Sequence, residues 1–395
     1  MTSEGRLLRV GVERVGPGRV GIDLEQFARD PYGSGIQRVL QQLAIFWPMH
    51  DIEADFIFPD GELFALLGPK AAGEILSAPF GGRQDGSDLR ELVRSRIEQA
   101  SGPRVLGSDL LSRYTSWLLP EVSYLPTVLH RFCTFRENML TVMIGFDALP
   151  MTQPSNYRFP PGMARNVNEY FLQLIKADRV VCISDYAREE FTQTLRRPKN
   201  LVTEVAHPGG DHFPIQAPRG LRDPVRFIRL GTLEARKMPV EILNAFLEAN
   251  PANTELVFVG GSSASYESIN AAVQTASDSD AAVTWIQGAT DQHVRELIAD
   301  SSVFLAIGIE GYGIPVLEAI AAGTPVVYSG IQPAAELMGG FGAVRHTGHT
   351  HADLVDLFDQ YSQPDSINAL NVQLDVSQIP TWKSFTDAVA QQCKS

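Results

Sequence analysis

Two carboxylates flank a glycine-rich loop in the stretch EGYGIPVLEAIAAGTPVV, which runs from Glu310 to Val327. The stretch follows the apolar run VFLAIG at residues 303–308, so we expect a strand, a loop and then a helix. Gly311 and Gly313 allow the backbone to turn tightly, and Pro315 suits the first position of the helix. The free N–H groups at such a helix start suit a phosphate or a sugar hydroxyl. The stretch therefore predicts a loop that binds an anion.

The two carboxylates themselves have two explanations. Glu310 ends the expected strand and Glu318 falls in the expected first helical turn, so both side chains can face one ligand. For an isolated pair the simpler explanation is that Glu318 complements the helix dipole and Glu310 is a solvated loop residue. Gly323 can likewise serve only as a C-cap.

The second constellation is RLGTLEARKMP at residues 229–239, in which a strand ends at Gly231 and the loop contains Arg236 and Lys237. Residues 215–395 contain only 10 of the 33 lysines and arginines, against 20 of the 46 acidic side chains. A diphosphate leaving group needs fixed positive charge where its negative charge develops. A solvated charge pair before a helix is the alternative, but the scarcity of cations favours phosphate binding.

Two other patterns resemble metal sites. Asp278 and Asp280 spell D-x-D in an expected helix-to-strand loop, where polar turn residues are ordinary. Three histidines lie in a Gly/Thr loop where we expect no carboxylate partner nearby, and therefore a solvated loop: His346, His349 and His351. We predict no metal site and no cofactor.

The elements that position these residues follow from the hydrophobic pattern, in which short β-branched runs alternate with amphipathic stretches. The expected strands are residues 7–13, 19–25, 51–58, 141–146, 179–184, 225–231, 254–261, 282–288, 303–308 and 325–329. The expected helices are residues 35–47, 160–177, 238–249, 267–276, 291–300, 315–323 and 381–393. Residues 206–224 are rich in Pro and Gly and predict a linker.

This doubly wound order predicts α/β domains that bind ligands at the carboxyl ends of their strands. We place an N-terminal domain at residues 1–214 and a second domain at residues 215–380. Residues 381–395 form a terminal helix that we expect to pack back toward the first domain.

Composition excludes several classes of protein. The chain has 395 residues, of which 44% are hydrophobic and 20% charged, which argues against disorder and a coiled coil. A formal net charge of −13 argues against a general nucleic-acid binder. Three cysteines without CxxC spacing predict neither a disulfide framework nor a zinc knuckle. No apolar run is long enough for a membrane-spanning helix.

The stretches EGYGIPVLEAIAAGTPVV and LGTLEARK together resemble the donor-site signatures of retaining GT-B glycosyltransferases, specifically glycosyltransferase family 4, also called group 1. SGIQRVL at residues 34–40 resembles the amino-terminal glycine loop of that family. ADRVVCISDYAREEF at residues 177–191 resembles its strand and helix before the linker, and TWKSF at residues 381–385 its last helix. The resemblance covers almost the whole chain and is weakest at residues 60–135.

The resemblance implies a GT-B fold, with two Rossmann-like domains that face each other across a cleft. It implies that the second domain binds a nucleotide-sugar donor and the first domain the acceptor. Glu318 would hold the ribose hydroxyls, Glu310 would contact the transferred sugar, and Arg236 and Lys237 would grip the diphosphate as catalytic groups. The remaining donor-binding residues of that domain would be Gly311, Tyr312, Gly313, Ile314, Pro315, Gly231 and Thr232. Such enzymes usually need no divalent metal.

The first domain adds further candidates. Gly33 and Gly35 open the helix expected from residue 35, either to approach the donor diphosphate or simply to make a tight turn. Asp147 aligns with the acidic member of a His-Asp pair of the family, and Phe146 replaces the histidine. Either Asp147 and the backbone suffice to contact the reacting sugar without that partner, or the geometry of the acceptor differs. Ser184 is expected only to cap a helix.

The predicted function is retaining, metal-independent transfer of a sugar to a carbohydrate or lipid-linked glycan acceptor. GDP-mannose is the first expected donor, followed by UDP sugars and dTDP-rhamnose. The alternatives are another GT-B activity, such as a nucleotide-sugar epimerase, and a catalytically silent subunit that binds a sugar nucleotide. We expect a cytoplasmic protein with no nucleic-acid partner. Peripheral contact with the inner face of the membrane would need a local basic patch, such as Arg196, Arg197 and Lys199.

Overall fold

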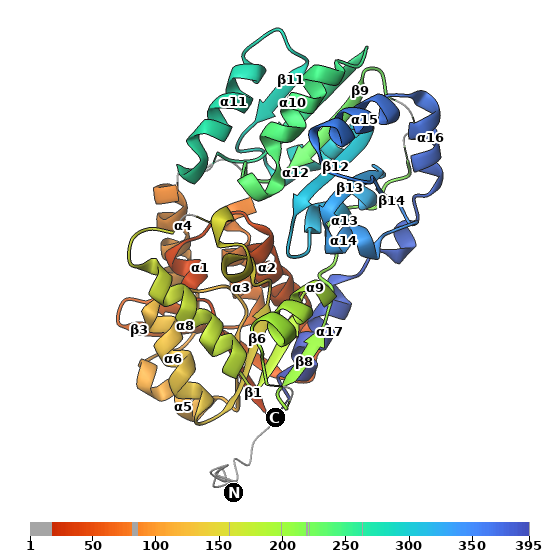
Figure 1. Cartoon of the computed structure of the whole chain (residues 1–395). Coiled ribbons are helices and arrows are strands. Elements are labelled where there is room, and N and C mark those ends of the chain that lie inside the picture. The colour runs from red at the N-terminus through yellow and green to blue at the C-terminus, as the bar shows by residue number, and fades with distance from the viewer. Residues whose placement is uncertain are drawn as a thin grey trace, which may run out of the picture.

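A computed structural model describes residues 18–80, 86–157, 159–198, 200–218, 220, 222–262 and 264–394 (Figure 1). Its strands form two sheets, an eight-stranded sheet in the first half of the chain and a six-stranded sheet in the second. The strand predicted at residues 7–13 lies outside the described residues.

The first sheet has the order β4-β3-β2-β1-β5-β6-β7-β8. Its strands, in chain order, are β1 (Arg19–Asp23), β2 (Glu53–Asp60), β3 (Leu63–Leu67), β4 (Arg104–Val105), β5 (Ser116–Leu119), β6 (Leu140–Gly145), β7 (Arg179–Cys182) and β8 (Val202–Val205). All neighbours pair in parallel except β2 with β3 and β3 with β4. At the centre, Ile22 of β1 lies opposite Phe56 on one side and Leu118 on the other.

Helices surround this sheet. They are α1 (Glu25–Arg29), α2 (Gly35–Phe46), α3 (Pro69–Leu76), α4 (Gly86–Gln99), α5 (Leu110–Arg113), α6 (Pro126–Arg136), α7 (Leu149–Thr152), α8 (Met163–Lys176) and α9 (Asp185–Glu189). α2 begins where the sequence indicates, because the Ser34 side chain caps it by accepting a hydrogen bond from the Gln37 N–H. Ser184 caps α9 in the same way, through the Ala187 N–H, as predicted.

The second sheet has the order β11-β10-β9-β12-β13-β14, and every pair is parallel. Its strands are β9 (Val225–Leu230), β10 (Thr254–Val259), β11 (Val283–Ile286), β12 (Val303–Ile309), β13 (Val326–Ile331) and β14 (Ala343–Arg345). The chain order reverses between β9 and β12, which is the switch point at which doubly wound sheets bind ligands. The predicted architecture of parallel sheets flanked by helices is therefore confirmed.

The helices of the second half are α10 (Pro239–Ala249), α11 (Glu267–Ser277), α12 (Asp291–Ala299), α13 (Ile314–Ala321), α14 (Pro333–Leu337), α15 (His351–Tyr361), α16 (Pro364–Val372) and α17 (Trp382–Gln392). Short turns of helix are η1 (Trp47–Met49), η2 (Ala78–Phe80), η3 (Gly107–Asp109), η4 (Pro154–Asn156), η5 (Glu190–Thr194), η6 (Ala235–Lys237), η7 (Ala264–Tyr266) and η8 (Val376–Gln378). Side chains of β9 alternate between the two faces of the sheet, so that Phe227 and Ile228 belong to different apolar clusters.

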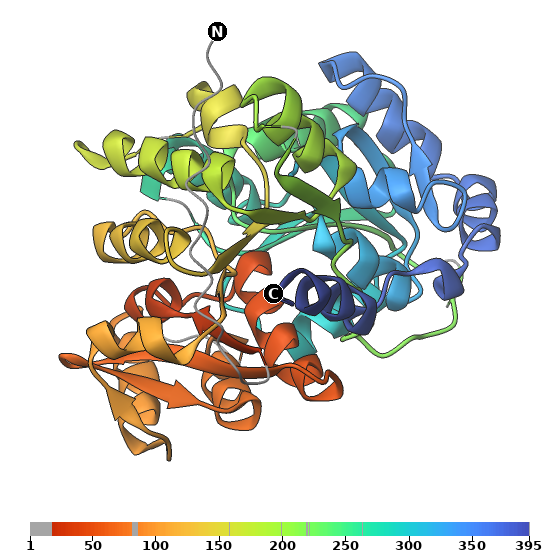
Figure 2. The ribbon, with the colours of Figure 1, turned by 90° about the horizontal axis from the view of Figure 1, so that it is seen from below.

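The last helix crosses back to the first domain. α17, the blue helix, lies beside α2 and β7 although it follows the second sheet in sequence (Figures 1 and 2). The Ser116 hydroxyl of β5 donates a hydrogen bond to the Cys393 carbonyl over 2.6 Å. The Arg179 guanidinium donates to the Gln392 carbonyl over 2.8 Å. These bonds fasten the end of the chain to the first sheet.

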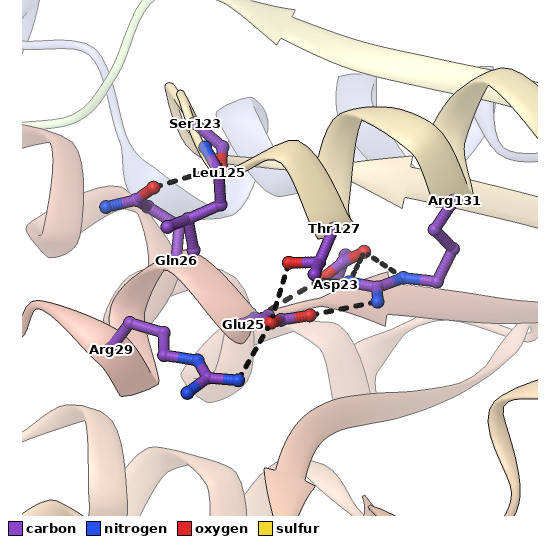
Figure 3. A network of polar contacts seen from close by, with 8 residues as sticks. All are labelled: Asp23, Glu25, Gln26, Arg29, Ser123, Leu125, Thr127 and Arg131. Carbon is purple, nitrogen blue, oxygen red and sulfur yellow. Dashed lines mark hydrogen bonds and ion pairs between the residues drawn. The ribbon is translucent and has the colours of Figure 1, made fainter. Parts of the chain in front are cut away.

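A buried ionic network holds the carboxyl end of β1 (Figure 3). Arg131 of α6 donates to Asp23 over 2.7 Å and to Glu25 over 2.9 Å, while all three side chains are nearly excluded from solvent. Thr127 donates to the other oxygen of Glu25 over 2.9 Å. The network ties α1 to α6 and so determines where the chain leaves β1 on its way to α2.

The basic patch proposed from sequence does not form as expected. Arg197 is only 2% exposed, and its guanidinium donates hydrogen bonds to the carbonyls of Leu174, Ile175, Ala177 and Val202 and to the Thr203 hydroxyl. The Arg197 side chain therefore caps the last turn of α8 and cannot face a membrane. Arg196 is exposed, and Lys199 lies outside the described residues.

We expect Arg197→Met to lower the free energy of unfolding by about 2–4 kcal/mol, because it leaves several buried carbonyls without a donor. Urea unfolding followed by circular dichroism would measure the loss. Arg196→Met is the matched control and should change stability by less than about 0.5 kcal/mol, as is usual for an exposed side chain. Equal effects of the two substitutions would contradict this role for Arg197.

Candidate functional site

The predicted catalytic residues of the second domain meet at the carboxyl edge of its sheet. β9 ends at Leu230 and β12 ends at Ile309, and these strands are neighbours. Because parallel neighbours end at the same edge, the loop after β9 meets the loop after β12. Arg236 and Lys237 come from η6 in the first loop, and Glu310 is the first residue of the second.

Glu310 binds both cations. Its Oε2 atom accepts a hydrogen bond from Arg236 Nη1 over 2.6 Å, and its Oε1 atom lies 3.2 Å from Lys237 Nζ. Arg236 Nη1 also donates to the Ile309 carbonyl over 2.7 Å. The three side chains are 14–17% exposed, so they are shielded from water but still reachable from one side.

This shielding changes the acid–base properties of the cluster. Burial opposes ionisation of Glu310, but the charges of Arg236 and Lys237 outweigh it and hold the pKa of Glu310 far below its usual range. Burial also lowers the pKa of Lys237, against the attraction of Glu310. Glu310 is therefore a fixed anion and cannot serve as a general acid near neutral pH.

Two further charged residues complete the cluster. Arg229 is 6% exposed, and its Nη2 atom lies 3.9 Å from Glu310 Oε1. Glu234 lies 2.7 Å from Arg236 Nη2. Neither role was predicted from the sequence. The available signal was Arg229 itself, because a cation inside the apolar strand VRFIRL needs a buried partner.

Gly231 makes room for the Lys237 ammonium group. A Cβ at position 231 would lie 2.6 Å from Lys237 Nζ, and the residue has a φ of +121°, which a side chain disfavours. The predicted donor-binding residue Gly231 thus lies in the site, and its lack of a side chain positions Lys237. Thr232, the next residue, is half-buried at the same edge.

The glycine loop leads directly into α13. Gly313, at a φ of +101°, is the N-cap, Ile314 is the first helical residue and Pro315 the second. The positive end of α13 is therefore only a few residues from Glu310, as predicted. Tyr312 differs from the expectation, because its side chain is 3% exposed and its hydroxyl donates to the Pro208 carbonyl over 2.9 Å. Only the backbone of Tyr312 can contribute to a ligand site.

The first domain touches this loop at three places. A Cβ at Gly311 would clash with the Asp147 carboxylate, so only glycine lets the two approach. The Ser184 hydroxyl donates to the Gly311 carbonyl over 2.9 Å, a contact beyond its predicted role as a cap. A Cβ at Gly35 would lie 3.5 Å from the Ile314 side chain. Asp147 and Gly35 therefore face the loop of the second domain.

Gly33 has a different reason to be glycine. A Cβ at position 33 would come within 3.1 Å of the Pro79 carbonyl, which belongs to the first domain. The tight-turn explanation therefore fits Gly33 better than an approach to a ligand. Gly35 alone of the two faces the second domain.

Asp147 is a half-buried acid of the first domain that faces the loop after β12. Burial raises its pKa to about 6, although the Arg236 charge and a hydrogen bond from the Leu149 N–H oppose the shift. Phe146, which stands where the family has histidine, is 4% exposed and part of the apolar core. No ring nitrogen can take its place without disturbing that packing.

Glu318 has its own partners and is not joined to Glu310. It is the fifth residue of α13, past the first turn, so the helix-dipole explanation weakens. Its Oε1 atom lies 2.8 Å from His212 Nε2 in the linker, and His212 Nδ1 accepts a hydrogen bond from the Trp382 indole over 2.9 Å. His212 was not predicted as a site residue, because no local sequence pattern indicates that it contacts Glu318, which is more than a hundred residues away in the chain.

The patterns that resembled metal sites have other roles, and the predicted histidine loop is shorter than expected because His351 is already the first residue of α15. Asp278 caps α11 and accepts from the Gln274 side chain, and Asp280 is exposed. His346 contacts the Asp353 carbonyl over 2.8 Å. His351 lies 2.7 Å from Glu248, a carboxylate partner that the sequence did not suggest. In the part of the chain that the structure describes, no three His, Cys, Asp or Glu side chains converge as metal ligands would.

Comparison with known proteins agrees with this geometry. Residues 215–361 match the family of glycosyl transferases group 1, so the resemblance to group 1 is confirmed for this part of the chain. Two curated proteins of Escherichia coli named serotype-specific mannosyltransferase WbdA are 24% and 25% identical, over 88% and 78% of this chain. They are covered over 44% and 38% of their own length, so the chain spans less than half of these relatives.

Solved structures share the whole architecture. HepE of Anabaena, solved with UDP and glucose, has a TM-score of 0.60 at 15% identity, covering 96% of this chain and 100% of that one. Sucrose-phosphate synthase of Thermosynechococcus elongatus has a TM-score of 0.66 at 15% identity, with 95% and 98% covered. The fold of this chain is therefore GT-B, as the sequence indicated.

No helix among the described residues is both long and apolar enough to cross a membrane.

The raised pKa of Asp147 predicts a pH-dependent cost of folding. In the unfolded chain an aspartate ionises near pH 4, whereas in the folded protein it ionises near pH 6. Between those values the folded state holds the extra proton, so this group lowers stability as the pH rises and the loss is complete above about pH 6. We expect Asp147→Asn to be more stable than the wild type by about 1–2 kcal/mol at pH 7.5 and by almost nothing at pH 4.

Urea unfolding of both proteins from pH 4 to pH 8 would measure this difference. A constant gap across that range would show that the substitution acts through packing and not through ionisation.

Proposed function

We propose that the chain, whose residues 215–361 match group 1 glycosyl transferases, is a retaining glycosyltransferase of family 4. It takes a sugar from a nucleoside diphosphate and transfers it to a carbohydrate or glycoconjugate acceptor. The observation that carries the proposal is the buried Arg236–Lys237–Glu310 cluster at the switch point of the second sheet, opposite Asp147 of the first domain.

The cluster suits a departing diphosphate. Nε of Arg236 is buried and has no hydrogen-bond partner among the described residues, so a phosphate oxygen would satisfy it. Lys237 supplies a second positive charge, and the start of α13 supplies oriented N–H groups and the positive end of its dipole. These groups stabilise the negative charge that develops as the bond from the sugar C1 to the phosphate oxygen breaks.

The acceptor hydroxyl then bonds to C1 on the face that the diphosphate has left, which retains the configuration. Its proton passes to the departing phosphate oxygen, so no protein base is needed. Glu310 keeps the cations in place and offers its remaining lone pairs to hydroxyls of the transferred sugar. Asp147, across the domain boundary, contacts the same sugar, and Glu318 holds the ribose.

For the donor we propose GDP-mannose. The support is the name of the two curated relatives, which are mannosyltransferases. UDP sugars are the second choice, because a structural neighbour, HepE, was solved with UDP-glucose. The acceptor is a carbohydrate or a lipid-linked glycan, and the reaction is cytoplasmic. We propose that the reaction needs no metal.

The proposal predicts hydrolysis of GDP-mannose by the purified chain alone and faster GDP release with a mannose-containing acceptor. Both rates should be unchanged by EDTA, because protein cations replace a metal. Coupled detection of GDP and chromatography of the sugar product would measure them, with UDP-glucose and dTDP-rhamnose as parallel donors. Conversion of the donor into an epimer without an acceptor would identify an epimerase. Nucleotide binding without any turnover would identify a silent subunit.

Removing the phosphate-binding charge should slow turnover more than it weakens binding. We expect Lys237→Met to reduce kcat by about 10²–10³-fold, because the lost charge acts mainly in the transition state. Arg226→Met is the matched control, since Arg226 lies at the opposite end of β9, where it pairs with Glu255 over 2.6 Å. Its kcat should stay within about twofold of the wild type. A normal kcat for Lys237→Met would contradict the proposal that this cluster binds the diphosphate.

A further inference from the structure

A chain of three buried side chains joins the terminal helix to the second domain. Trp382 is the first residue of α17 and is fully buried, while the side chains of His212 and Glu318 are 7% and 10% exposed. The Trp382 indole N–H donates to His212 Nδ1 over 2.9 Å. His212 Nε2 lies 2.8 Å from Glu318 Oε1. Linker, terminal helix and α13 thus meet at one imidazole.

The indole determines which imidazole nitrogen carries the proton. An indole nitrogen can only donate, so His212 Nδ1 must accept and carries no hydrogen. The neutral ring therefore has its proton on Nε2, which donates to the Glu318 carboxylate. His212 consequently acts as a directed donor, and Glu318 Oε1 is held on the linker side while its second oxygen keeps its lone pairs for another donor.

The surrounding backbone leaves His212 little freedom. The Asp211 carboxylate accepts a hydrogen bond from the Trp382 N–H over 2.8 Å, and the Gly210 N–H donates to the Pro380 carbonyl over 3.1 Å. The His212 ring also packs against Trp382 and Phe213, with centroids 5.8 Å and 4.9 Å away. The linker and the start of α17 therefore form one rigid mount for the imidazole.

We propose that His212 is a positioning residue that directs the Glu318 carboxylate to the ribose of the donor, and that Trp382 sets the tautomer that lets it do so. The inference rests on the proposed function, because it needs a nucleotide bound at Glu318. It makes recognition of the ribose depend on the linker and on the helix that crosses back to the first domain.

The test compares ribose with a sugar that lacks its hydroxyls. Affinities of GDP, UDP and their 2′,3′-dideoxy forms would be measured by calorimetry for the full chain and its variants. The wild type should bind GDP or UDP about tenfold more tightly than the dideoxy form, which is the usual effect of losing hydrogen bonds to a charged group. Glu318→Ala should bind both forms with the weaker affinity.

His212→Phe keeps the ring packing but removes the donor, and should lose most of the preference for ribose. His212→Gln places an amide N–H where Nε2 lies and should restore most of it. Trp382→Phe should reduce the preference less, because His212 can then adopt either tautomer. Asp387→Ala is the control, since Asp387 lies on α17 and pairs with His50 and Lys383, away from Glu318, so its preference should match the wild type.

The outcomes distinguish a failure of the donor site at Glu318 from a failure of the positioning role of His212. If the wild type bound neither GDP nor UDP, or bound the dideoxy forms equally well, the donor site and this inference would both be overturned. If Glu318→Ala lost the preference while His212→Phe kept it, the donor site would stand and the role of His212 would fall. If His212→Phe weakened both forms equally, His212 would be merely structural.

Discussion

The second domain is organised around one buried carboxylate that must hold several cations. Glu310 ends β12 beside the loop after β9, and Arg236, Lys237 and Arg229 all direct positive charge at it. Without Glu310 these cations would repel one another in a partly dry environment, which proteins tolerate only when charges are paired. Gly231 and Gly311 follow from that requirement, because a Cβ at either position would displace Lys237 or Asp147. The charges at the switch point therefore constrain the backbone of the loops after β9 and β12.

Elsewhere in the chain, buried arginines are also paired, but with different kinds of partner. Arg197 has no acidic partner and is satisfied by carbonyl groups at the end of α8. Arg131 is satisfied by two carboxylates at the end of β1. Arg236 differs from these two arginines, because its buried Nε lacks a hydrogen-bond partner among the described residues.

Several contacts between the domains lie close to the same loop. Ser184 and Asp147 approach Gly311, the Tyr312 hydroxyl binds the linker, and Glu318 reaches His212. Arg38 of α2 adds an ion pair of 2.6 Å with Asp291, at the start of α12. The chain that follows the second sheet returns to the first through α17, so the linker is held from both sides (Figure 2). A ligand at Glu310 would therefore touch elements that both domains position.

The sequence by itself determined the class of fold and the groups that carry charge in the second domain. Alternating apolar runs predicted β9, β12 and the helix after them, because burial on both faces of a parallel sheet leaves a continuous local signal. Strands β3, β4, β5, β8 and β14 were not identified from the sequence, because each has five residues or fewer and so leaves a short apolar run. The pairing of Glu310 with Arg236 could have been predicted from the sequence, since the two residues follow β12 and β9, which are neighbours in a doubly wound sheet.

Only the tertiary structure decided the remaining roles. The positions of His212 and Trp382 relative to Glu318 depend on how the chain crosses between domains, and no local pattern records that crossing. Tyr312 and Arg197 looked available in sequence but are buried, because burial depends on neighbours far away along the chain. Hydrophobic periodicity and the residue types in loops are local properties, so they can be recognised from consecutive residues of the sequence. The partner of a buried polar group is a property of the folded chain.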